Sequence, residues 1–173
     1  TADPVHQITI IPRGGAGGMT ISLPTEDRSY RSKTELTEEL AVCLGGRVAE
    51  QLFLGDISTG ASSDLERATD VAHAMVTRYG MSDKLGEVVL DSDRGEVFLG
   101  RSMARTKPYS EEVAGQVDRE VRALLDAAHH TCEEILKRRA DIVERVADYL
   151  LEHEVMDAET FAAFFEKPEK TEE

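Results

Sequence analysis

The sequence has no tryptophan and only two cysteines, Cys43 and Cys132. The absence of a CxxC pair argues strongly against a cysteine-based zinc site, and two thiols on apolar helical faces are typical of a protein that keeps them reduced. No uninterrupted apolar run approaches the roughly 20 residues of a membrane-spanning helix, and no secretory leader pattern is present. The sequence opens on Thr1 rather than methionine, so we expect a chain that was processed or cut from a larger protein.

Positive charge is also scarce. Acidic residues outnumber basic ones by 34 to 20, which gives a net charge of −14. Neutralising phosphates requires clustered lysine and arginine, so this balance predicts that nucleic acid is not a partner, and it disfavours anionic membrane surfaces. The length of 173 residues is normal for one domain with a real core.

A third absence concerns histidine pairs. The five histidines are His6, His73, His129, His130 and His153, and none belongs to a His-Glu-x-x-His motif, which places two imidazoles one helical turn apart for zinc. His129 has Glu133 four residues later, and this pair has the spacing to share an ion, although a solvated helical pair is the favoured interpretation. No Ser-His-Asp or Cys-His arrangement follows from the spacing.

The N-terminal pattern is typical of strands. Val5–Ile11 is rich in β-branched residues, and Met19–Leu23 follows a glycine-rich stretch over residues 13–18. That stretch has no Gly-Lys-Ser/Thr ending and leads into a strand, so we interpret it as a connector and not as a phosphate-binding loop.

From Ser32 onward the pattern becomes helical. Leu36, Leu40, Leu44, Val48 and Leu52 form one apolar stripe. Gly45-Gly46 interrupts this helix, and its cost of about 1 kcal/mol per glycine suggests close approach of another backbone.

The remaining pattern indicates further helices and one more short strand. We predict a mainly α fold, a helical bundle with a small N-terminal β element, spanning residues 1–165 and followed by a disordered acidic tail over residues 166–173. The expected elements are helices over about 32–54, 64–79, 110–136 and 142–151, a short helix capped by Asp157, and a strand over 96–99.

Asp64 is the candidate that matters most. Ser63 is placed to cap a helix and to form a capping box with Glu66, which puts Asp64 in the first helical turn, where the helix dipole favours a carboxylate. First-turn acids are common for that reason alone, and Glu50 is by itself an ordinary helical surface acid.

Several separated segments nevertheless resemble the peptidase domain of the FtsH-type ATP-dependent zinc metalloproteases. The resemblance covers residues 3 to about 165. It is specific because five separate segments occur in the same order as in the family. These segments are Asp3-Pro4-Val5-His6 through Arg13-Gly14, Gly45-Gly46-Arg47-x-Ala49-Glu50, Ser58 to Thr69, Met75 to Gly86, and Gly95 to Arg101.

This resemblance implies a membrane-anchored homo-hexamer in which an ATPase ring, using ATP and Mg²⁺ at the cytoplasmic face of the membrane, feeds unfolded or membrane polypeptides to peptidase domains. Zn²⁺ would be held by two histidines of a helix that belongs just before residue 1 and by an aspartate that matches Asp64. Glu50 matches a glutamate near that site and is a weaker candidate. Met19, Thr20, Ile21, Ser22 and Leu23 resemble an edge strand that pairs with substrate.

The chain departs from the family pattern at three positions, where Gln51, Ser63 and Tyr79 replace a frequent glutamate, asparagine and tryptophan. None of these three substitutions removes a role assigned above. The missing His-Glu-x-x-His motif does, because its two histidines would be zinc ligands. One carboxylate is too few for catalytic zinc, so we expect this chain by itself to be inactive as a protease and to contain no catalytic residue. A non-catalytic helical assembly or adaptor module is the alternative interpretation.

Overall fold

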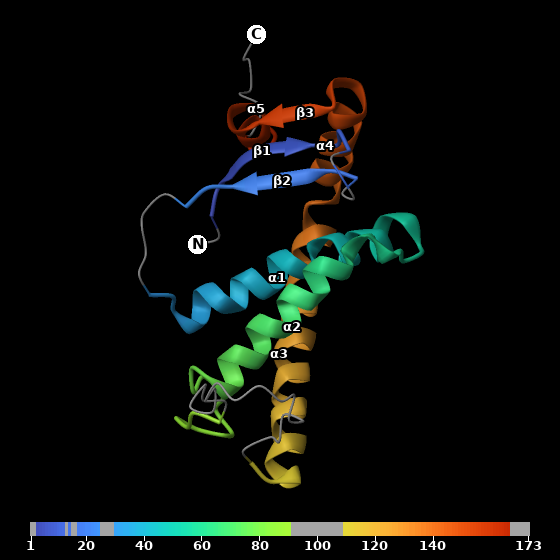
Figure 1. The fold of residues 1–173 in the computed structure, drawn as a ribbon. Helices are drawn as coiled ribbons and strands as arrows, with labels where there is room; N and C mark the ends of the chain where they lie inside the picture. The colour runs from blue at the N-terminus through green and yellow to red at the C-terminus, as the bar shows by residue number, and fades with distance from the viewer. Residues whose placement is uncertain (1–2, 13, 15–16, 25–29, 91–108, 167–173) are drawn as a thin grey trace. The chain divides into compact units, whose positions relative to one another are not determined.

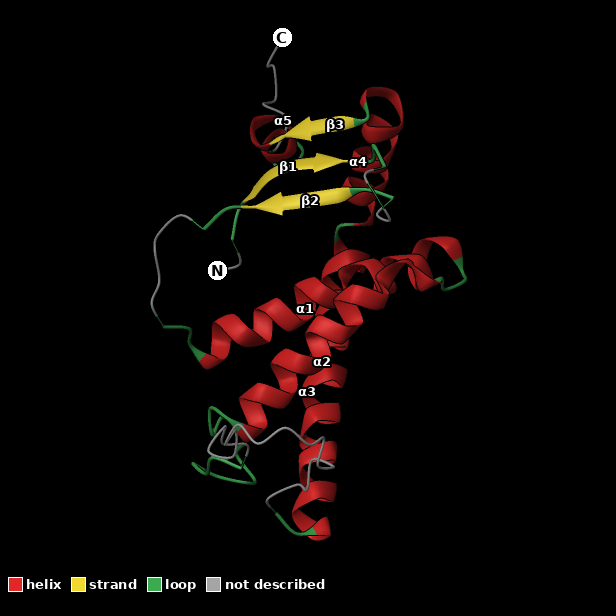
Figure 2. Cartoon of the chain, in the orientation of Figure 1, coloured by secondary structure: helices red, strands yellow, loops and turns green. Residues whose placement is uncertain are grey.

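The computed structural model describes residues 3–12, 14, 17–24, 30–90 and 109–166 (Figures 1 and 2). The chain divides into two compact units, one formed by residues 1–30 with 134–173 and the other by residues 31–133. The elements are β1 (Val5–Thr9), β2 (Met19–Ser22), α1 (Lys33–Ala49), a π-helix (Glu50–Leu54), a 3-10 turn (Thr59–Ala61), α2 (Ser62–Thr77), α3 (Glu111–Arg138), α4 (Ala140–His153), β3 (Val155–Asp157) and α5 (Ala158–Ala163). The mainly helical prediction with a small β element is confirmed.

The first unit contains a three-stranded antiparallel sheet in the order β2–β1–β3 (Figure 2). Ile8 of β1 lies opposite Thr20 of β2 and Met156 of β3. The two predicted strands are therefore confirmed, although β1 ends at Thr9 and β2 at Ser22, one or two residues earlier than the sequence indicated. The third strand was not predicted.

β3 follows from how α4 ends. Glu154 adopts a left-handed conformation with φ 61° after the last helical residue, and its carbonyl accepts a hydrogen bond from Ile10 N at 3.0 Å. Met156 then points into the core with 1% of its surface exposed. The predicted cap is confirmed next to it, because the Asp157 carboxylate accepts a hydrogen bond from Thr160 N at 2.8 Å at the start of α5.

The core of the second unit comes from facing apolar stripes on α1 and α2. The predicted stripe of α1 is buried at Leu36, Leu40, Leu44 and Val48, and Cys43 is buried beside it. The buried face of α2 consists of Ala68, Ala72, Met75, Val76 and Thr77. Small alanines on α2 leave room for the leucines of α1, which is how two helices reach native packing density.

The ends of α1 match the prediction in part. Ser32 caps the helix in a capping box with Glu35, and the helical path stops at Gly55, whose φ of 68° is left-handed. The last turn, however, is the π-helix, which the sequence did not reveal. The prediction that another backbone approaches Gly45-Gly46 closely is wrong for the described residues, because a Cβ added at either glycine would meet no heavy atom within 4 Å.

The start of α2 differs from the prediction by a turn. Ser58, not Ser63, supplies the capping hydroxyl, because its Oγ accepts a hydrogen bond from Gly60 N at 3.1 Å and opens the 3-10 turn that leads directly into α2. The N-cap residue of α2 is Ala61, which makes no side-chain hydrogen bond, so the predicted capping box between Ser63 and Glu66 is wrong. Asp64 still falls in the first turn of α2, as predicted.

Two predictions fall outside the described residues: the strand over 96–99, and the disordered tail beyond Glu166. Within the described part of the chain, no helix has both the length and the apolar character to cross a membrane. Cys43 and Cys132 are both free and buried, in agreement with the prediction of unpaired thiols.

Candidate functional site

Asp64 stands exposed in the first turn of α2. Within the described part of the chain, its carboxylate has no hydrogen-bond or ion-pair partner. A first-turn carboxylate is favoured by the positive end of the helix dipole, so the position is stable without such a partner. An exposed and unpaired carboxylate is chemically suited to bind a metal ion, because carboxylate oxygen is one of the ligands that zinc accepts.

The turn that precedes Asp64 is held by Glu50. The Glu50 carboxylate accepts a hydrogen bond from Ser58 N at 3.1 Å and a short one from Ser58 Oγ. Arg47 lies one turn earlier on α1, with Nη1 3.6 Å from Glu50 Oε2. Glu50 therefore connects the π-helix to the 3-10 turn, and it acts on Asp64 by holding the chain that leads to it. The hydrogen bonds from Ser58, with a smaller contribution from Arg47, hold the pKa of Glu50 below its ordinary value.

We predict from this pKa that Glu50 stabilises the fold in a pH-dependent way. A pKa lowered by folding means that the contribution is present above the ordinary carboxyl value of 4.5 and disappears as the pH falls through the lower folded value. Glu50→Gln should therefore be less stable than the parent chain near pH 6, and the difference should shrink as the pH falls below the ordinary carboxyl value. Urea unfolding at a series of pH values measures the difference, and a gap that widens on acidification would contradict the assignment.

Arg67 lies one helical turn after Asp64 but is engaged elsewhere. Its Nε and Nη2 donate to Glu39 Oε1 on α1, at 3.1 and 2.6 Å. Cys43 lies within electrostatic reach of both Arg67 and Asp64. Burial is the main reason that the pKa of the Cys43 thiol is raised, so this cysteine is held as a neutral, inert thiol.

The predicted substrate strand is β2, which forms one edge of the described sheet. Met19, Thr20 and Ser22 are exposed while Ile21 is partly buried. Leu23 follows the strand, and its N–H donates to Pro4 O at 3.2 Å. An edge strand presents unpaired backbone groups on its outer side, which is the feature that a strand-like ligand uses.

The histidines of the described chain do not surround Asp64 with ligands. His129 Nε2 lies 3.2 Å from Gln51 Oε1, His73 Nδ1 lies 3.3 Å from Thr77 Oγ1, and His153 stacks on Tyr149 with ring centroids 4.1 Å apart. Among the described residues no group of three or more histidine, cysteine, aspartate or glutamate side chains is arranged to hold a metal ion. Asp64 thus fits the role of one ligand, but the described chain does not form a complete metal site.

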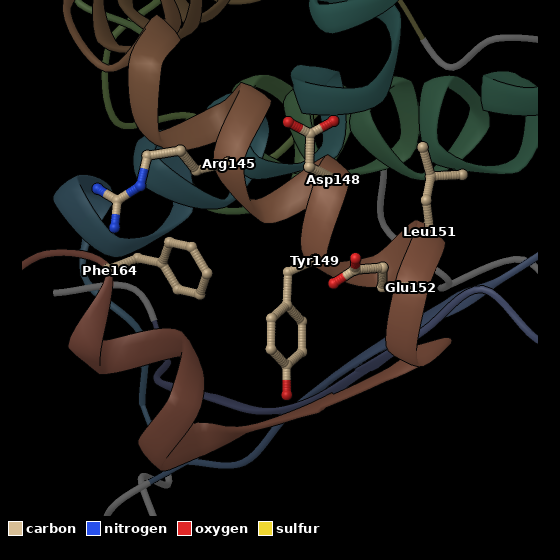
Figure 3. A pocket seen from close by; sticks show the side chains of 6 residues that line it. All are labelled: Arg145, Asp148, Tyr149, Leu151, Glu152 and Phe164. Atoms are coloured by element: carbon tan, nitrogen blue, oxygen red, sulfur yellow. The ribbon is translucent and has the colours of Figure 1, made fainter.

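A shallow groove of about 530 Å³ lies along α4 beside the end of α5 (Figure 3). Its lining side chains include Tyr149, Phe164 and Arg145, whose guanidinium carbon is 5.0 Å from the centre of the Phe164 ring. The carboxylates of Asp148 and Glu152 complete the lining together with Leu151. The lining has no histidine or cysteine, the residues that dominate zinc sites, so this groove is not a second candidate for the metal.

Comparison with known proteins gives the family. The family model described as "Peptidase family M41" matches residues 1–164. The protein named ATP-dependent zinc metalloprotease FtsH of Caldicellulosiruptor bescii is 51% identical over 160 residues, which is 92% of this chain and 26% of that relative. The FtsH 2 of Alkaliphilus metalliredigens is 52% identical over 163 residues, covering 94% and 24% of the two chains. The FtsH of Rubrobacter xylanophilus is 51% identical over 158 residues, covering 91% and 24%.

The match of the family model defines the class as a peptidase-type domain. The chain belongs to peptidase family M41. It spans about a quarter of the length of these curated relatives. The resemblance inferred from the five similar sequence segments is therefore confirmed at the level of the family.

Proposed function

We propose that this chain is part of the proteolytic domain of an ATP-dependent zinc metalloendopeptidase, in which Asp64 supplies one ligand of the zinc ion. The observation that supports this most is the exposed, unpaired Asp64 carboxylate at the start of α2, in a chain that matches peptidase family M41 from residue 1 to 164. Relatives about 50% identical are named zinc metalloproteases, which agrees with a metal-binding role.

The other two ligands are proposed to be the histidines of a His-Glu-x-x-His helix upstream of residue 1. A catalytic zinc site normally uses three protein ligands, and the described chain offers one. The glutamate of the same motif would be the general base. On this proposal, residues 1–173 alone bind zinc weakly and do not cleave peptides.

When bound, zinc supplies a polarised substrate carbonyl and water of lowered pKa. The residues of this chain provide the positioning. Asp64 presents its carboxylate from a helix start that the dipole stabilises, and Glu50 fixes the turn before it through Ser58. We assign no proton-transfer step to Glu50, because its carboxylate is already occupied by two hydrogen bonds from Ser58.

Polypeptides are the proposed substrates, and β2 is the proposed docking strand. An extended peptide that adds to an exposed strand gains main-chain hydrogen bonds regardless of its sequence. Met19, Thr20, Ile21 and Ser22 form the strand, and Leu23 continues it by sequence but lies beyond its end. Such recognition suits a protease for unfolded or membrane proteins, because these share an accessible backbone and not a sequence.

The remaining properties are proposed from the family alone. They are a homo-hexamer, an ATPase domain that uses ATP and Mg²⁺ outside this chain, and attachment to the membrane with the peptidase part on its cytoplasmic face. The words "ATP-dependent" in the names of the relatives, and their roughly fourfold greater length, are the support.

The test compares residues 1–173 with the same chain produced together with its upstream coding segment. Calorimetric zinc titration should give one tight site only in the longer protein, and casein cleavage should appear only there. Tight stoichiometric zinc with proteolysis by residues 1–173 would refute the proposal. A longer protein that binds no zinc would instead favour a non-catalytic assembly or adaptor module.

A further inference from the structure

Asp64 and Arg67 are three residues apart on α2, a spacing at which side chains are neighbours on the helix surface. An aspartate and an arginine at this spacing are oppositely charged and able to form an ion pair. The structure shows a different arrangement. Arg67 donates two hydrogen bonds to Glu39 of α1, whereas the Asp64 carboxylate makes no hydrogen bond or ion pair among the described residues and acts on Arg67 only as a lesser electrostatic contribution to its raised pKa.

Glu39 is well suited to hold Arg67. Only 10% of its side chain is exposed, whereas the Arg67 side chain is 66% exposed. Arg31 Nη1 lies 2.5 Å from Glu39 Oε2, close enough for an ion pair although Oε2 accepts no well-aligned hydrogen bond. A carboxylate that is removed from water is costly without cations beside it, so Glu39 retains both guanidinium groups. Its hydrogen bonds raise the pKa of Arg67 above the ordinary value.

We propose that Glu39 is a positioning residue that draws Arg67 away from Asp64 and thereby keeps the Asp64 carboxylate free for the metal ion. The inference rests on the proposed function, because it takes Asp64 as a ligand. A carboxylate paired with a guanidinium must give up that pair before it binds zinc, and an uncompensated cation one turn away repels a dication. Glu39 lessens both obstacles at once, since its carboxylate partly offsets the charge of Arg67 and its two hydrogen bonds from Arg67 hold that side chain against α1.

Four versions of the protein that includes the upstream segment test this idea: the parent, Glu39→Gln, Arg67→Gln and the double variant. Zinc dissociation constants come from competition with a chromogenic chelator. Glu39→Gln should bind zinc about fivefold more weakly, which corresponds to the upper range of an exposed ion pair that now competes for Asp64. Arg67→Gln should bind like the parent, and the double variant should return to within about twofold of the parent value.

The double variant distinguishes a role of Glu39 in positioning Arg67 from a role in stabilising the packing of α1 against α2. If the Glu39–Arg67 pair only braced α1 against α2, Arg67→Gln would weaken zinc binding as much as Glu39→Gln, and the double variant would not recover. Either result would overturn the inference. Glu39→Met, which replaces the carboxylate by an apolar chain of similar length, takes the place of Glu39→Gln if the latter does not fold.

A second readout needs no metal. In the chelator-treated protein, a double-mutant cycle of Asp64→Asn and Arg67→Gln by urea unfolding should show only weak coupling when Glu39 is present. The same cycle in the Glu39→Gln background should show clearly stronger coupling, because Arg67 then pairs with Asp64. Additivity in both backgrounds would contradict the inference.

Asp64→Asn in the zinc assay separates the proposed zinc-binding function from the proposed role of Glu39. Zinc binding unchanged by Asp64→Asn would remove the proposed function itself. Zinc binding lost in Asp64→Asn, but unaffected by Glu39→Gln, would leave the proposed function intact and overturn only the role of Glu39.

Discussion

Replacing Asp64 by alanine should abolish zinc-dependent proteolysis in the protein that carries the upstream segment. The loss of one of three protein ligands should weaken zinc binding by more than about 100-fold, since even removal of a residue that only supports a ligand costs 10–100-fold. The fold should survive, because Asp64 is exposed and has no described partner whose loss would leave a buried group unpaired. Zinc content after dialysis and casein cleavage at saturating ATP measure the two effects.

Asp70→Ala is the matched control for this experiment. Asp70 is also an exposed aspartate of α2, but it lies beyond the first turn. The Asp70→Ala substitution should leave zinc content and proteolysis unchanged. Equal losses from both alanines would point to helix stability and not to coordination. Full activity of the Asp64 variant would exclude Asp64 as a ligand.

Leu40→Ala should cause the largest loss of stability among single changes in the α1–α2 core. Leu40 is completely buried, and truncating a buried leucine removes apolar contacts and leaves a cavity. We expect a loss of about 3 kcal/mol, within the usual 2–5, and a melting temperature lower by about 6–12 °C for a chain of this size. Chemical and thermal unfolding followed by circular dichroism measure both quantities.

Leu54→Ala makes the same chemical change where the side chain is 76% exposed. It should alter stability by less than about 0.5 kcal/mol, because little apolar surface returns to water. Similar losses at the two positions would mean that the α1 stripe does not form the core of this unit.

Local rules were sufficient to predict much of the fold. The four-residue repeat of Leu36, Leu40 and Leu44 identified the buried face of α1, because helical periodicity alone decides which side chains share a face. The helix start at Ser32 and the cap at Asp157 are predictable for the same reason, since a cap depends on residues within three positions.

The parts that were missed depend on residues far apart in sequence. β3 has only three residues and exists because it pairs with β1, and a pattern that short does not reveal its partner. The Ser63 cap failed because Ser58 opens the turn earlier, and Ser58 is held by Glu50. Only the resemblance to the FtsH-type peptidase domain identifies Asp64 as a candidate ligand, because local sequence rules do not distinguish it from any other exposed aspartate in a first helical turn. Its relation to Glu39 becomes visible only when α1 and α2 are packed together.

The central place of β1 has a consequence for how the chain is made. Its partner β2 ends at Ser22 and its partner β3 begins only at Val155, so the sheet receives its last strand only after the residues between them have been synthesised. Closing so large a loop is slow, because the entropy of bringing its ends together is lost before the new contacts form. Until then the edge of β1 that later pairs with β3 is unpaired, so the β1–β2 hairpin is open to pairing with other chains during synthesis.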